Sequence, residues 1–196
     1  MAPRVVRCVA LAALFAAAGS SYADGGEAGP TITEARRYYV LDATQLAALR
    51  LQLAEKALAA GLVRGAIGRA RQDVEVRYRL DPGPVGCRLS ELAVRVDVTL
   101  DLPAWQPEAK TRRPLRARWA RMIAALTFHE EGHRDNAVWA ANQLHAGLAA
   151  LGPAVDCDAM GKQAQRAMFR VKLRFQLREQ AYDRRTGHGV SQGSVL

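Results

Sequence analysis

The chain has 196 residues, a length that suits one domain with a real hydrophobic core after removal of an export signal. Its formal net charge is +9, and the excess is mostly arginine, dense in residues 112–121 and 166–178. Because aromatic residues make up only 6% and no nucleic-acid-binding motif accompanies the charge, we exclude DNA and RNA as partners. In an exported protein such charge more often forms a solvated face or contacts an anionic envelope surface.

The N-terminus predicts a signal peptide over residues 1–23. Arg4 and Arg7 form a basic start, residues 8–18 form an apolar run, and Ser21-Tyr22-Ala23 fits the small-x-small cleavage rule. The apolar run is shorter than the roughly 20 residues that a membrane span needs. We expect a bacterial periplasmic or secreted protein, cleaved near Ala23 and without a stable membrane span. The alternative is a helical anchor that is never removed.

Two cysteines, Cys87 and Cys157, remain after the predicted cleavage removes Cys8. In an oxidising compartment two cysteines usually pair, so we expect a disulfide between them; the alternative is two separate thiols. Neither has another cysteine or a histidine at ligand spacing, which argues against a role in binding zinc.

The predicted elements that follow the signal alternate short strands with helices. Residues 24–34 are rich in Gly, Glu, Pro and Thr and predict a flexible leader to a domain over 35–189. A strand is expected over 36–41, and a helix over 42–60 with Asp42 as its N-cap. Alternating residues predict antiparallel strands over 74–80 and 94–100, with a turn at 81–84 and Cys87 in a loop. Two long helices, over 114–150 and from about 156 to 182, precede a tail over 190–196.

The first long helix carries His129-Glu130-Glu131-Gly132-His133. Histidines four residues apart project from one helix face and can hold one Zn²⁺. Glu130 can then take a proton from a zinc-activated water as general base, which is the logic of the H-E-x-x-H motif. The alternative is a solvated polar face.

Two features of the same helix argue against that alternative. Glu130 falls on the apolar stripe that includes Leu126 and Ala137, where an unpaired carboxylate would be costly. Gly132 lies inside the helix, where glycine costs about 1 kcal/mol relative to alanine, and close approach of another backbone or of substrate would explain it.

A catalytic zinc usually has three protein ligands. His145 lies twelve residues beyond His133 on the same helix, too far to reach the same metal. His188 is the remaining candidate among the histidines, and the alternative is a frayed tail residue.

At HEEGH and at Tyr182-Asp183-Arg184-Arg185-Thr186-Gly187-His188-Gly189, the sequence resembles a family of bacterial secreted proteins of unknown function that are predicted zinc-dependent proteases. The resemblance covers nearly the whole mature chain. It implies a zincin-like α+β fold, with His129, His133 and His188 as metal ligands. Asp183 is the rival third ligand, or else orients a ligand histidine. Tyr182 would donate to the oxyanion of the reaction intermediate, with a core tyrosine as the alternative.

We therefore expect a small, mostly antiparallel sheet beside an active-site helix, with a C-terminal helix that returns the third ligand. The expected function is that of an exported zinc metallopeptidase, acting on a peptide or protein substrate that could lie along strand 91–100. The alternatives are a non-catalytic envelope protein with a structural zinc, and a hydrolase of cell-wall amides.

Overall fold

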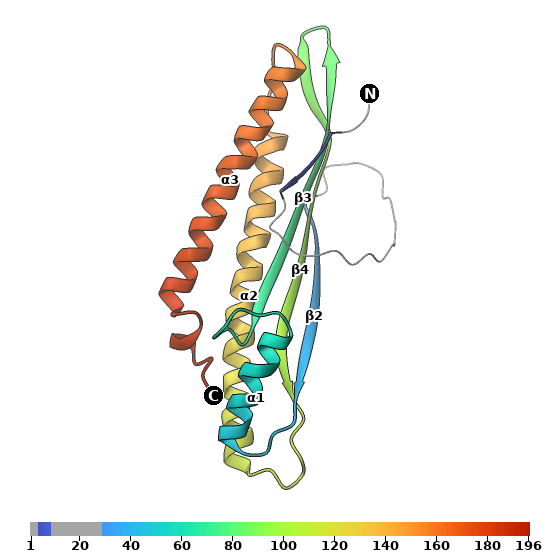
Figure 1. Cartoon of the computed structure of the whole chain (residues 1–196). Helices are drawn as coiled ribbons and strands as arrows, with labels where there is room; N and C mark the ends of the chain where they lie inside the picture. Colours follow the sequence, from blue (N-terminus) through green and yellow to red (C-terminus); the bar gives the residue numbers. More distant parts are fainter. Residues whose placement is uncertain (1–3, 9–28) are drawn as a thin grey trace. The chain divides into compact units, whose positions relative to one another are not determined.

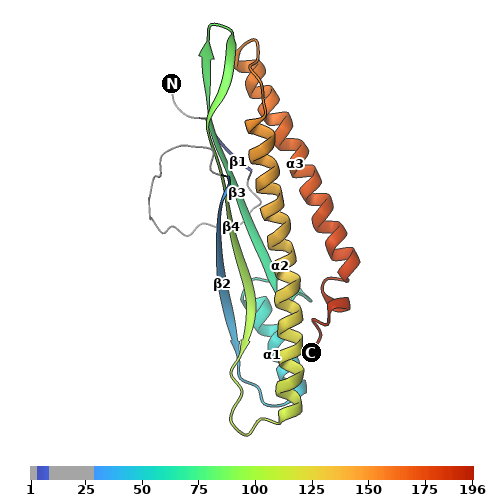
Figure 2. The same ribbon diagram turned by 180° about the vertical axis from the view of Figure 1, so that it is seen from behind.

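The computed structural model of the protein describes residues 4–8 and 29–196, which form an α+β fold (Figure 1). A mixed sheet has the strand order β1-β3-β4-β2. β1 pairs antiparallel with β3, whereas β2 and β4 run in the same direction (Figure 1, Figure 2). The predicted α+β class is confirmed. The elements are β1 (Arg4–Cys8), β2 (Thr31–Leu41), α1 (Leu46–Ala59), β3 (Arg69–Gly83), β4 (Gly86–Trp105), α2 (Arg113–Ala149), α3 (Cys157–Thr186) and the short 3₁₀ helix η1 (Val190–Gln192).

These elements divide into two compact units, and the longest elements contribute to both. The disulfide unit contains Gln72–Asp97 and Ala137–Gln176, together with β1 and the first residues of β2. The histidine unit contains Glu34–Arg71, Val98–Asn136 and Leu177–Leu196. All the predicted site residues belong to the histidine unit.

In the disulfide unit, the predicted disulfide between Cys87 and Cys157 is present. Cys87 is not in a loop as expected, because β4 begins before it and its backbone exchanges hydrogen bonds of 2.8 and 2.9 Å with Ala154. Both cysteines pack with Met160 in a small core. The disulfide spans 70 residues of sequence, and the chain-entropy model gives a loop of that length about 4 kcal/mol of stabilisation.

The strands extend further than the alternating pattern predicted. Val94, Val96, Val98 and Leu100 are all buried as expected, but β4 continues through Pro103 to Trp105. β2 begins at Thr31, inside the predicted flexible leader. Because β4 lies between β3 and β2, its backbone is already paired on both sides. The hypothesis that a substrate pairs along strand 91–100 is therefore wrong.

In the histidine unit, α1 buries Leu49, Leu53 and Ala57, which recur every four residues and so share one helix face. The predicted N-cap at Asp42 is wrong: the helix begins after Gln45. Asp42 instead accepts a hydrogen bond of 2.6 Å from the Gln52 side chain, which stabilises the turn before the helix.

The predicted signal peptide falls largely outside the described residues. Within it only the backbone of β1 is described, and it pairs with Val74–Tyr78 of β3. Among the helices that the structure describes, none is long and apolar enough to cross a membrane. The disulfide is compatible with secretion.

Candidate metal centre

The two motif histidines lie on one face of α2, as their spacing predicted. His129 and Glu130 are buried, each with an exposed fraction of 4%, and His133 is half-buried. The Nε2 atoms of the two imidazoles are 3.3 Å apart. Glu130 therefore does occupy the apolar stripe of the helix, and the solvated-face alternative is wrong.

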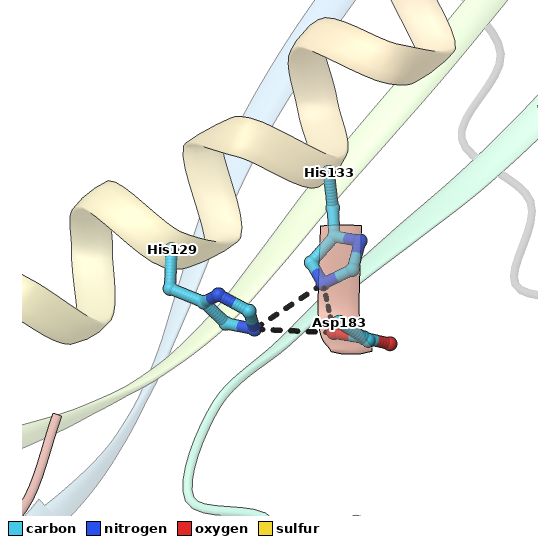
Figure 3. Close-up of side chains that lie close together, drawn as sticks. All are labelled: His129, His133 and Asp183. Atoms are coloured by element: carbon cyan, nitrogen blue, oxygen red, sulfur yellow. Dashed lines mark hydrogen bonds and ion pairs between the residues drawn. The ribbon is translucent and has the colours of Figure 1, made fainter. Parts of the chain in front are cut away.

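Asp183 of α3 completes a group of three around the same point (Figure 3). Its Oδ1 atom lies 3.1 Å from His133 Nε2 and 3.5 Å from His129 Nε2. The three ligand atoms all lie within 4.8 Å of one another. Two imidazole nitrogens and one carboxylate oxygen are donor types that suit zinc.

The opposite nitrogen of each imidazole has its own partner. His129 Nδ1 lies 3.0 Å from Gln192 Oε1, and His133 Nδ1 lies 3.0 Å from Glu179 Oε2. Because carboxamide and carboxylate oxygens only accept hydrogen bonds, a neutral imidazole in either place carries its proton on Nδ1. Both Nε2 lone pairs then face each other and the Asp183 carboxylate. Three acceptors that converge in this way are suited to share a positive charge, either a metal ion or a proton on one imidazole.

The two histidines differ in how readily they take up a proton. Burial lowers the pKa of His129 below its ordinary value, and the neighbouring His133 adds to that effect. Burial opposes charge on His133 as well, but the hydrogen bond and charge of Glu179, together with Asp183, raise the pKa of His133 above its ordinary value. Glu179 is itself held by Asn136, whose side-chain amide donates to it at 2.7 Å.

Glu130 is a buried carboxyl beside this group. Burial raises its pKa to about 7, although His133 and a hydrogen bond from the Ala70 backbone act in the opposite direction. A Cβ atom at Gly68 would lie 2.7 Å from Glu130 Oε1, so glycine at that position leaves the carboxyl its space. A group with a pKa near neutrality is suited to accept and release a proton.

Tyr182 packs against the rings of both motif histidines. Its ring stacks on His129 at 5.1 Å between centroids, and its hydroxyl donates to the His129 carbonyl oxygen at 3.2 Å. The Gln192 side chain donates to the same hydroxyl. We therefore assign Tyr182 a positioning role in place of the expected contact with an oxyanion.

The same tyrosine accounts for Gly132. A Cβ atom there would lie 2.1 Å from the Tyr182 hydroxyl oxygen, so a side chain, and neither a backbone nor a substrate, is what approaches the helix.

Gly132→Ala and Gly147→Ala, two substitutions in the same helix, are expected to have opposite effects. A Cβ atom at Gly147 would meet nothing within 4 Å, so its replacement should stabilise the protein by about 0.5–1 kcal/mol through helix propensity. Gly132→Ala should destabilise it by about 1–3 kcal/mol, because the rigid Tyr182 ring must shift. Urea denaturation of both variants measures the difference. A Gly132→Ala protein as stable as Gly147→Ala would contradict the packing described.

His188, the predicted third ligand, is not among the three atoms that converge. Its side chain is 80% exposed, and its Nδ1 lies 3.5 Å from Asp183 Oδ1. Its backbone has a positive φ of 52°, which turns the chain at the end of α3. The histidine therefore approaches the group through Asp183.

The group opens into a cleft of about 860 Å³, large enough for several residues of an extended peptide. One part of its wall is formed by His129, His133 and Asp183, and another part by α1 and the segment over residues 63–70. Ser194, Val195 and Leu196 also line the cleft. Residues 190–196 are thus part of the site and not a loose tail, since Ser194 and Leu196 are buried.

Sequence reasoning missed Glu179 and Gln192, which hold the two imidazoles. Glu179 had a signal: with Tyr182, Asp183 and Thr186 it recurs at helical spacing on one face of α3. Gln192 had none, because it reaches His129 through the turn formed by Gly187 and Gly189, both of which have positive φ.

A family model described as "Bacterial protein of unknown function (DUF922)" matches residues 36–189. This range includes HEEGH and the distal segment over 182–189. Comparison with curated proteins gives no match. Comparison with solved structures gives none either.

Proposed function

The chain belongs to the bacterial DUF922 family, since the family model matches well over half of it, and we propose that it is an exported zinc-dependent hydrolase that acts on peptide bonds. The observation that carries the proposal is the convergence of His129 Nε2, His133 Nε2 and an Asp183 oxygen, with both Nδ1 atoms engaged elsewhere. In this proposal Asp183 replaces the predicted His188 as third ligand.

The residues around the group fit a bound cation. The imidazoles are held from behind by Gln192 and Glu179, which fix both rings with Nε2 forward. Three protein ligands leave a position free for water or substrate, as in catalytic zinc sites. When bound, zinc would lower the pKa of a water molecule to about 7 and polarise a carbonyl group.

Glu130 would act as the general base. It lies next to His129 on the wall of the cleft, and its carboxyl group is desolvated but held by the Ala70 N–H. It would take a proton from the attacking water and later release it to the leaving amine. This pairing of two helical histidines with an intervening glutamate supports a zincin-like active site.

The cleft favours a peptidase over a purely structural zinc. A structural zinc is usually enclosed by four protein ligands, whereas this group has three and borders an open cleft. The hydrolase of cell-wall amides remains the second candidate, since the same group would cleave either kind of amide and the charge of +9 suits an anionic wall.

Removal of metal tests the proposal directly. Metal-free protein titrated with Zn²⁺ should bind one ion per chain, and hydrolysis of casein or of peptidoglycan fragments should appear only after zinc is added. Circular dichroism before and after chelation serves as the control for folding. A chain that binds no zinc would overturn the proposal. A chain that binds zinc tightly but cleaves neither substrate would indicate the structural role.

A further inference from the structure

The wall of the cleft that is formed by α1 and residues 63–70 is cationic. Among the described residues that line the cleft, every charged side chain outside the metal group and its partners is an arginine: Arg50 of α1, Arg64, and Arg69 at the start of β3. The remaining residues on that wall are small or apolar, such as Leu53 and Val63.

The acids of the cleft do not neutralise these arginines. Glu179 and Asp183 contact the histidines, and Glu130 accepts from Ala70. Of the three cleft arginines, Arg69 pairs with buried Asp101, whose carboxylate also lies within 3.1 Å of Arg37 and Arg71. Because three guanidinium groups share this one carboxylate, Arg69 is only partly neutralised.

The three arginines differ in what they already bind. The Arg50 guanidinium donates to the backbone oxygen of Leu196 at 2.8 Å inside the cleft, so Arg50 is already engaged and contributes mainly its charge. Arg64 is exposed and makes no ion pair with any described residue. A guanidinium that faces a cleft without a carboxylate partner is a ready site for one.

We propose that the substrate of this cleft is a peptide that carries a carboxylate near the bond to be cleaved, and that Arg64 binds this carboxylate while Arg50 and Arg69 add to its attraction. The inference rests on the proposed function for the position of the reacting bond. The carboxylate belongs either to an acidic side chain or to the C-terminus of the peptide, because a guanidinium binds both in the same way.

Binding to the zinc-loaded Glu130→Gln protein tests the proposal without relying on turnover. The probes are fluorescent alanine-rich peptides with Glu, Gln or Lys at successive positions, each made with a free or an amidated C-terminus. We expect one Glu peptide or the free-acid peptides to bind about tenfold more tightly than their neutral counterparts in fluorescence anisotropy. A preference for Glu identifies a side chain, and a preference for the free acid identifies the C-terminus.

Adding Arg64→Glu should abolish this preference, and the matched control is Arg121→Glu. Arg121 is exposed on α2 and outside the cleft lining, so it changes the net charge equally and should leave the preference intact. The proposal would be overturned if all the peptides bound equally well. It would also be overturned if Arg64→Glu and Arg121→Glu reduced the preference for the acidic peptides equally. Hydrolysis of the same peptides by the unmodified protein is measured separately. Cleavage without a preference for the acidic peptides would contradict this inference alone. Selective binding of the acidic peptides without cleavage would contradict the proposed function alone.

Discussion

Asp183→Ala should weaken zinc binding by at least about a hundredfold, whereas His188→Ala should change it by less than about threefold. The Asp183 oxygen lies 3.1 and 3.5 Å from the two Nε2 atoms, and its removal leaves two ligands for the metal. His188 is largely exposed and contacts Asp183 rather than the histidines. Competition with a chromophoric chelator measures the zinc affinity of both variants.

The design contains its own controls. Asp135→Ala removes an exposed aspartate of α2, paired with neighbouring Arg134, and should leave zinc affinity unchanged. Near-ultraviolet circular dichroism, sensitive to the Tyr182 ring against His129, reports whether Asp183→Ala has altered the packing. Retention of zinc by Asp183→Ala together with its loss in His188→Ala would reverse the ligand assignment and restore the prediction made from the sequence.

The contrast between these two residues shows what a linear sequence can specify. The spacing of His129 and His133 fixed their relation, because a helix places residues four apart on one face. The third ligand comes from another helix, and its choice depends on how α3 ends. Asp183 lies within α3, whereas His188 lies beyond the last residue of the helix and has a positive φ. The Asp183 side chain therefore converges on the two histidines, and the His188 side chain is exposed.

The rest of the fold shows the same contrast between local patterns, which the sequence specifies, and contacts between distant segments, which it does not. The alternating valines of β4 predicted its burial, because each side chain has a fixed face on a strand. Its inner position between β3 and β2 could not be predicted, since pairing is decided by strands far apart in sequence. The sequence correctly predicted that another group approaches the helix at Gly132, but that group is the side chain of a tyrosine fifty residues away.

Glu130→Gln should reduce hydrolysis by about 10²- to 10⁴-fold while zinc content and folding persist. The amide keeps an oxygen that can accept from the Ala70 N–H, and it removes a carboxyl whose burial already raises its pKa to about 7. Zinc affinity should stay close to that of the unmodified protein, because Glu130 is not among the three converging ligands.

The neighbouring Glu131→Gln is the matched control for this substitution. Glu131 pairs with Arg36 at 2.8 Å on the outside of α2, so the same chemical change one residue away should alter activity by less than about twofold and stability by about 1 kcal/mol at most. Turnover of one substrate, zinc content and urea denaturation should be measured on both. If the two variants hydrolyse equally well, Glu130 is not the base. If Glu130→Gln loses its zinc as well as its activity, the carboxyl supports the metal group, and the loss of activity follows from the loss of metal.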